Sequence, residues 1–405
     1  MKKILSILLT GLVFLLVSCK STVPNVVISK VYGNTNVENN LIELYNNSEE
    51  NVNLKDYKIN FYNNGSSDVT NTINLTGTIE ANSFFVIGSN NFDVLEHKDK
   101  IDFVYEGNLP FNGDDAFELT YKNQNVDQVG IVGIDIPFIR NHTLIRLGDL
   151  ADYQPFETYN QFNYIGYLPG VFEYLKNDDY EIKTLEDLYA GPRLEQKYLD
   201  LDFADGTFGS GGTAEVTLVS IADGDTATFH PKDSSGGFTG GASMRYYFVD
   251  TPEVAGAPGG PAPWAYVASK YNKEFLLSDA GNKDIILQSV PDNTLTDTFG
   301  RWLGLIWVNG HLSQFLITAE GLSDNINPIY TNTDLKMTYK NVPYLTFLLF
   351  AENRARENGW GMKGYPLKED GEKAPDWNYS ANKNTTSNPN WEPNLPLPWE
   401  NWINL

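Results

Sequence analysis

The sequence predicts a multidomain protein in which an antiparallel β-sandwich is followed by a small α+β barrel. Short runs of β-branched and aromatic residues recur between turn clusters across residues 24–178, which is the pattern of a sandwich. A Gly-rich stretch at 206–212 then separates this region from one where strand-like and helical runs are mixed. With 405 residues, 41% of them hydrophobic, the chain is long enough for two or three domains and is not wholly disordered.

The first 19 residues have the pattern of a lipoprotein signal peptide. Two lysines precede the apolar run Ile4–Val17, which is too short to span a bilayer. The run ends in Leu16-Val17-Ser18-Cys19, which resembles the lipobox of bacterial lipoproteins. That resemblance implies a diacylated Cys19 at the mature N-terminus and a lipid anchor on the extracellular face of the cell membrane. The alternative is an ordinary signal peptide in which Cys19 has no role.

Cys19 is the only cysteine of the chain. An intramolecular disulfide is therefore excluded, and so is a metal site built on cysteines. The four histidines are scattered without the spacing of a metal site or a catalytic triad. The core of the protein must then be stabilised by packing alone.

Residues 24–178 contain the strand-like runs of the predicted sandwich. These runs are Val26–Tyr32, Leu41–Tyr45, Tyr57–Tyr62, Phe84–Ile87, Phe117–Tyr121 and Val126–Val132. Turn clusters such as Asn63-Asn64-Gly65 and Asn112-Gly113-Asp114 lie between them. In the second cluster, Asp114 and Asp115 are expected to form a turn, with a calcium site as the alternative.

The same region resembles the lamin-tail domain, an immunoglobulin-like β-sandwich that is found fused to bacterial secreted nucleases. The resemblance depends on the segments 27–32, 42–46 and 52–57, and it extends to 112–115 and 143–146. These motifs are mostly structural, so the resemblance implies a fold and an accessory role. We expect a spacer, a substrate tether or an adhesion module.

Residues 179–212 are predicted to form a linker, because they begin acidic and end in glycines. The glycine run is not a phosphate-binding loop, since no Lys-Ser or Lys-Thr pair follows it. After residue 366 the chain is rich in Pro, Asn and Trp. We expect this tail, 366–405, to form an extension without regular structure that lies against a neighbouring surface.

Residues 213–365 are predicted to form a barrel of the OB type, in which strands are combined with three helices. The predicted strands are Ala214–Ala222, Met244–Val249, Asp284–Val290 and Trp302–Val308. The predicted helices run from Pro263 to Leu277, from Ser313 to Glu320, and from Pro343 to Glu357.

Three short motifs in this region carry acids and arginines at the ends of predicted strands. They are Asp223-Gly224-Asp225-Thr226, Arg245 with Asp250-Thr251-Pro252-Glu253, and Asp297-Thr298-Phe299-Gly300-Arg301. Strand ends of a barrel can converge on one mouth. Carboxylates there suit a hard cation such as calcium, and guanidinium groups suit phosphate oxygens. A further carboxylate can orient or deprotonate a water molecule. The set therefore indicates phosphodiester hydrolysis.

The three motifs, their order and the helical segment 266–270 between them resemble the staphylococcal nuclease (thermonuclease) family over about residues 214–361. The resemblance implies that Asp225 and Asp250 ligate calcium together with the backbone carbonyl of Thr251. It also implies that Glu253 acts on the water. Arg245 and Arg301 would bind and stabilise the phosphate.

Some positions depart from that family. The loop between Thr226 and Arg245 is long, the loop 254–261 has no lysine, and Thr298 and Phe299 replace a lysine and a tyrosine that are common near the nucleotide. These changes are expected to alter substrate preference more than catalysis. Tyr330 is a candidate for stacking on a base.

The resulting expectation is a lipid-anchored, calcium-dependent extracellular nuclease that acts on DNA, RNA or both and leaves 3′-phosphates. Two alternatives remain. The first is that Arg245 and Asp250 form only a structural ion pair. The second is a catalytically inactive surface lipoprotein that uses both domains as binding or adhesion modules.

The net charge of −23 bears on the substrate. Residues 21–178 carry nine basic and 22 acidic side chains, whereas residues 213–365 carry 11 and 16. Most of the acidity therefore lies outside the predicted nuclease-like domain. The charge excludes tight, nonspecific binding of polyanions through a basic patch, but it does not exclude a local site with two arginines and a metal.

Overall fold

The computed structural model describes residues 25–194, 204–205, 208–232, 240–254, 262, 264–277 and 284–363. The predicted signal peptide 1–19, including Cys19, and the predicted tail 366–405 lie outside the described residues. Among the helices that are described, none is both long and apolar enough to cross a membrane.

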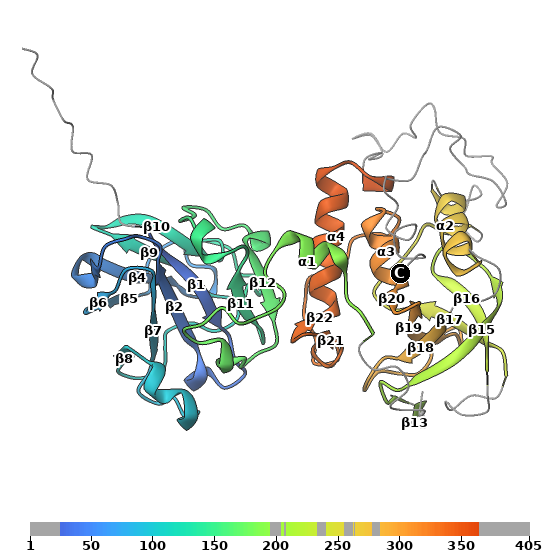
Figure 1. The fold of residues 1–405 in the computed structure, drawn as a ribbon, viewed down its shortest axis with the longest axis horizontal. Coiled ribbons are helices and arrows are strands. Elements are labelled where there is room, and N and C mark those ends of the chain that lie inside the picture. The colour runs from blue at the N-terminus through green and yellow to red at the C-terminus, as the bar shows by residue number, and fades with distance from the viewer. Residues whose placement is uncertain are drawn as a thin grey trace, which may run out of the picture.

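The N-terminal domain is a sandwich of two sheets (Figure 1). Apolar side chains of both sheets form one buried cluster. The first sheet has the order β12-β11-β1-β2-β7-β8 and the second has the order β10-β9-β4-β5. The first contains β1 (Val26–Tyr32), β2 (Leu41–Asn46), β7 (Ser83–Ser89), β8 (Phe103–Tyr105), β11 (Thr143–Arg146) and β12 (Tyr164–Tyr167). The second contains β4 (Tyr57–Tyr62), β5 (Asn71–Asn74), β9 (Ala116–Tyr121) and β10 (Gln124–Val129). A small pair is formed by β3 (Val52–Asn53) and β6 (Thr78–Ile79).

The strand predicted over Val126–Val132 ends earlier, at Val129. The next residue, Gly130, has a φ of 79°, which an extended strand does not accommodate. The turn predicted at Asp114 and Asp115 is present. Asp115 is buried and accepts hydrogen bonds from the backbone of Asn64 and Asn112 at 2.7 and 2.8 Å. Its carboxylate therefore fixes the turn.

A buried ion pair joins the two sheets. Arg146 on β11 pairs with Asp127 on β10, and their side chains are 1% and 0% exposed. Arg146 also donates from Nε to the carbonyl of Ile28 at 2.9 Å, while Asp127 accepts from the backbone N–H groups of Ile28 and Phe156 at 2.7 and 2.9 Å. Every charge is thus paired and hydrogen-bonded, which is the condition under which burial of charges is tolerated.

We expect Asp127→Ala to lower the free energy of unfolding by about 3–5 kcal/mol, because it leaves the Arg146 guanidinium buried without its counter-charge. Urea unfolding followed by circular dichroism measures this loss. The matched control is Asp152→Ala, at an exposed aspartate of the same domain, which should change stability by no more than about 0.5 kcal/mol. Equal stability of the two variants would show that the pair contributes nothing.

The C-terminal domain contains a closed five-stranded barrel, which is compatible with the predicted OB-fold. Its strands are β15 (Thr213–Ile221), β16 (Thr226–Pro231), β17 (Ala242–Tyr246), β18 (Ile285–Ser289) and β19 (Trp302–Val308). The antiparallel order is β17-β16-β15-β18-β19, and a parallel pairing of β17 with β19 closes it. Gly304 makes that closure possible. A Cβ at this position would lie 2.4 Å from Cε of Met244 on β17 and 2.9 Å from the carbonyl of Gln288 on β18.

Three helices accompany the barrel: α2 (Ala265–Leu277), α3 (Ser313–Ala319) and α4 (Tyr344–Glu357). The helix predicted to start at Pro263 thus begins at Ala265. Glycines with positive φ follow the other two, Gly321 at 67° after α3 and Gly359 at 64° after α4, as expected for helix C-termini.

The segment 179–212, predicted as a linker, contains packed structure in its described parts. A short helix, α1 (Leu185–Ala190), begins with a capping box between Thr184 and Asp187, and its Leu188 is fully buried. Further along, Gly209 of β14 (Phe208–Gly209) bonds through its backbone to residues 292 and 293, ahead of β19. Glycine content therefore did not distinguish a loop packed on the barrel from a free linker.

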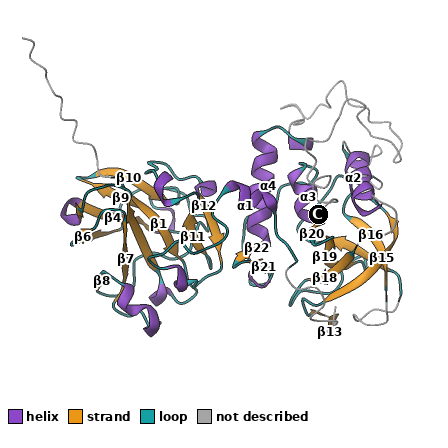
Figure 2. Cartoon of the chain, viewed as in Figure 1, coloured by secondary structure: helices purple, strands orange, loops and turns teal. Residues whose placement is uncertain are grey.

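The two domains share a contact surface in which α1 and α4 lie between the sheets (Figure 2). Thr346 on α4 donates a hydrogen bond to the carbonyl of Gly166 on β12 at 2.8 Å. The ring of His142 from the sandwich domain stacks on Tyr330 of the barrel domain, with 4.6 Å between the ring centroids. Tyr330, the candidate for stacking on a base, therefore lies at the boundary between the domains, stacked on a ring of the protein itself.

Candidate active site

The first motif forms the turn between β15 and β16, and two neighbouring segments hold it. Gly224 allows their approach, because a Cβ there would lie 2.6 Å from Oγ1 of Thr251 and 2.7 Å from Cβ of Ala268 on α2. From α2, the buried Asn272 donates to the carbonyl of Asp223 at 3.0 Å. The turn therefore presents Asp225 at a defined place beside the second motif.

Asp225 and Thr251 are joined directly. The Asp225 side chain is 2% exposed, and its Oδ2 accepts hydrogen bonds from the backbone N–H and the hydroxyl of Thr251 at 2.5 and 2.9 Å. Oδ1 accepts from the hydroxyl of Thr226 at 3.2 Å. Two motifs that are separate in the sequence thus meet at one carboxylate.

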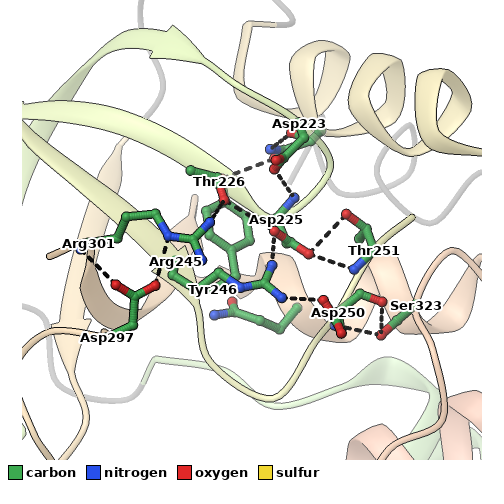
Figure 3. A network of polar contacts seen from close by, with 12 residues as sticks. Asp223, Asp225, Thr226, Arg245, Tyr246, Asp250, Thr251, Asp297, Arg301 and Ser323 are labelled. Atoms are coloured by element: carbon green, nitrogen blue, oxygen red, sulfur yellow. Dashed lines mark hydrogen bonds and ion pairs between the residues drawn. The ribbon is translucent and has the colours of Figure 1, made fainter. Parts of the chain in front are cut away.

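Arg245 connects that buried carboxylate to an exposed one (Figure 3). It lies on β17 directly opposite Thr226 on β16. Its Nη1 forms an ion pair with Oδ1 of Asp225, and its Nη2 forms one with Oδ1 of Asp250. The Asp250 side chain is 64% exposed, and that of Arg245 is 15% exposed. One guanidinium therefore bridges two carboxylates at the surface end of the barrel strands.

A loop after α3 holds the backbone of Asp250. The N–H of Asp250 donates to Oγ of Ser323 at 3.1 Å, and its carbonyl accepts from the N–H of Asp324 at 2.7 Å. Partial burial and the nearby charge of Asp250 raise the pKa of Asp324. Ser323 and Asp324 are site residues that sequence reasoning missed, because their approach depends on how the chain returns after α3.

The third motif places Arg301 on the other side of Thr226. Nε of Arg301 pairs with Oδ2 of Asp297 at 2.8 Å, and Nη1 donates to Oγ1 of Thr226 at 3.2 Å. Burial alone would raise the pKa of Asp297, but hydrogen bonds from the backbone and side chain of Arg301, and from the backbone of Phe299, hold it below its ordinary value. Asp297 therefore fixes Arg301 within the turn ahead of β19.

Asp223 is a further site residue whose role the sequence motif alone did not indicate. Its Oδ1 accepts from the backbone N–H of Asp225 at 3.2 Å. Burial raises its pKa, while Thr226 and the positive charges of Arg245 and Arg301 act in the opposite direction. The first motif thus contributes a second carboxylate, that of Asp223, whose pKa burial raises and the positive charges of Arg245 and Arg301 lower.

Glu253 is exposed on the loop that follows Asp250. Its backbone carbonyl accepts a hydrogen bond from the N–H of Ala262 at 3.0 Å, which closes the base of that loop. Its carboxylate takes no part in the ion pairs of Arg245 with Asp225 and Asp250. Of the six residues predicted for the site, Glu253 is thus the one that the structure leaves outside the network.

The oxygen atoms of the site provide some of the ligands that a hard cation needs. Asp225 and Asp250 each direct a carboxylate oxygen at the same positive group, the guanidinium of Arg245. Calcium takes six to eight oxygen ligands, so backbone carbonyls such as that of Thr251 and water would have to complete its shell. Within the described residues, no group of three or more His, Cys, Asp or Glu side chains is arranged to hold a metal ion.

Comparison with protein families matches residues 20–133 to the Lamin Tail Domain. The N-terminal immunoglobulin-like sandwich agrees with that match and continues beyond it through β11 and β12. The search of curated proteins gives no match to this chain.

Proposed function

We propose that the barrel domain is a phosphodiester hydrolase that acts on DNA, RNA or both. One observation carries the proposal: Asp225, Arg245, Asp250 and Arg301, from three separate segments, form a continuous polar network at one end of the barrel. Arginines that are held in place at the surface end of strands suit hydrolysis of a charged ester, because negative charge grows on the phosphate oxygens in the transition state.

The chemistry divides among the residues by their positions. Arg301 and Arg245 bind the phosphate oxygens through their N–H groups, and Asp297 holds Arg301 in orientation through its Nε. Glu253, exposed on its loop, accepts a proton from the water that attacks phosphorus. By the family resemblance, the bond from phosphorus to the 5′ oxygen breaks, the 5′ oxygen takes up a proton from solvent water, and a 3′-phosphate remains. A calcium ion bound by Asp225, Asp250 and the Thr251 carbonyl would supply further positive charge.

The place of action in this proposal is the extracellular face of the cell membrane. It rests on the lipobox-like sequence that ends in Cys19 and on the charged start and apolar run before it. The Lamin Tail Domain would then hold the barrel domain away from the lipid anchor, or would bind substrate or a neighbouring surface.

A second candidate function is a catalytically inactive surface lipoprotein that binds partners. The observation in its favour is that Arg245 already forms ion pairs with both Asp225 and Asp250, an arrangement that a purely structural ion-pair network would also have. The fold alone does not separate the two functions.

Incubation of the purified full chain with DNA and with RNA in the presence of calcium distinguishes the hydrolase from the inactive binding protein. The hydrolase is expected to release short oligonucleotides from at least one of them. Intact DNA and intact RNA would favour the binding module.

A further inference from the structure

A pocket of about 260 Å³ lies at the boundary between the sandwich and barrel domains. Residues 136–166 form its wall on the sandwich side, and residues 327–350 form the opposite wall. Sites for small molecules occur preferentially at domain interfaces and are mostly apolar, with a few polar groups. The position of the pocket, away from the network around Arg245, makes it independent of the proposed hydrolase.

The walls are held in place, so the pocket is preformed. Aromatic contacts between described residues cross the boundary, among them His142 with Tyr330 at 4.6 Å and Phe162 with Phe350 at 5.3 Å between ring centroids. The hydrogen bond from Thr346 to the carbonyl of Gly166 fixes the same boundary. Because these contacts prevent the walls from collapsing onto each other, an apolar molecule that enters gains contacts without a large rearrangement.

The lining excludes a charged occupant. In a chain of which 20% is charged, none of the described residues lining this pocket is Asp, Glu, Lys or Arg. His142, which is 4% exposed, has its pKa lowered to about 4 by burial and is therefore neutral at pH 7. A phosphate or carboxylate inside would find no counter-charge, so the lining favours an uncharged occupant over a nucleotide.

The rim is apolar as well. Ile136 from the sandwich and Ile329 from the barrel domain are 45% and 49% exposed, although both side chains are large and apolar. Tyr159 and Gln161, which carry a hydroxyl and an amide group, also line the wall on the sandwich side. An apolar cavity of about 150 Å³ is known to accept benzene, so the larger volume here suits a bicyclic ring.

We propose that this interdomain pocket binds an uncharged aromatic molecule of about the size of indole, enclosed by aromatic rings from both domains. Polar groups at the wall, such as Tyr159 and Gln161, would then select for a single hydrogen-bonding group on the ligand.

Isothermal titration calorimetry of the full chain with indole tests the proposal, with indole-3-carboxylate as the charged probe. We expect saturable binding of one indole per chain and at least tenfold weaker binding of the carboxylate. Absence of saturable indole binding, or equal binding of both probes, would overturn the proposal.

Variants at the rim locate the site. Ile136→Glu places a charge at the mouth and is expected to weaken indole binding at least tenfold, and Ile329→Glu should do the same from the opposite wall. The matched control is Ile134→Glu, since Ile134 lies on the same loop, is 43% exposed and does not line the pocket. It should bind indole within twofold of the unaltered chain. Equal loss in Ile134→Glu and Ile136→Glu would place the binding elsewhere.

Discussion

Replacement of Arg245 by alanine is expected to lower the rate of phosphodiester cleavage by about 10²–10³-fold, as loss of one fixed group that stabilises the transition state does. The side chain of Arg245 is 15% exposed, and its guanidinium forms ion pairs with Asp225 and Asp250, which it exchanges for phosphate oxygens when the two carboxylates ligate calcium. Initial rates on a labelled oligonucleotide, measured at saturating calcium, give the loss directly. The substitution also removes the counter-charge of the buried Asp225 and could unfold the domain. Circular dichroism at the assay temperature therefore checks that the variant is folded.

Two further variants make the Arg245 result specific. Arg245→Lys keeps the charge but loses the forked geometry, so it should recover only part of the rate. Arg356→Ala, at a half-exposed arginine on α4 that pairs with Glu352, should keep the full rate. Equal rates in Arg245→Ala and Arg356→Ala would remove Arg245 from the catalytic site.

Glu253→Gln is expected to lower the cleavage rate by about 10²–10⁴-fold, the usual contribution of a general base. The substitution keeps the size of the side chain and removes only its ability to accept a proton. Because Glu253 is exposed and its carboxylate takes no part in the described ion pairs, the free energy of unfolding should not change. The rate and the urea midpoint of the same preparation measure both quantities.

Glu357→Gln is the matched control for Glu253→Gln. Glu357 is also exposed and lies at the end of α4 in the same domain. Its substitution should leave both the rate and the stability unchanged. A fully active Glu253→Gln variant would show that another group, such as Asp223 or Asp324, takes the proton, or that water attacks without a base.

Much of the fold could be predicted because hydrophobic patterning determines it locally. The strands β1, β4 and β19 coincide with the predicted runs, since each is rich in β-branched or aromatic residues and largely buried. The strand β5 was missed because Asn71–Asn74 is an edge strand in which Ile73 alone is buried. The helix α1 was missed because its six residues carry too short a pattern to register as a helix.

The contacts of the candidate site could likewise be predicted only in part. The contacts of Asp225 with Arg245 and Thr251 join motifs that had already been singled out, because strand ends of a barrel converge. The contacts of Asp250 with Ser323 and Asp324 were missed, since they are set by the path of the chain after α3 and by no motif. The position of Tyr330 at the boundary between the domains was not predicted either. An aromatic residue carries no sequence signal that distinguishes a substrate contact from a domain boundary.

The dependence of cleavage on calcium shows whether the barrel domain is a metal-dependent phosphodiester hydrolase. The purified full chain is incubated with labelled DNA and with labelled RNA, first with calcium, then with excess chelator, and finally with calcium restored. We expect cleavage of at least one substrate that disappears in chelator and returns with calcium, because Asp225 and Asp250 then ligate calcium in place of their ion pairs with Arg245. Cleavage that persists unchanged in chelator, or no cleavage of either substrate with calcium, would contradict this proposal.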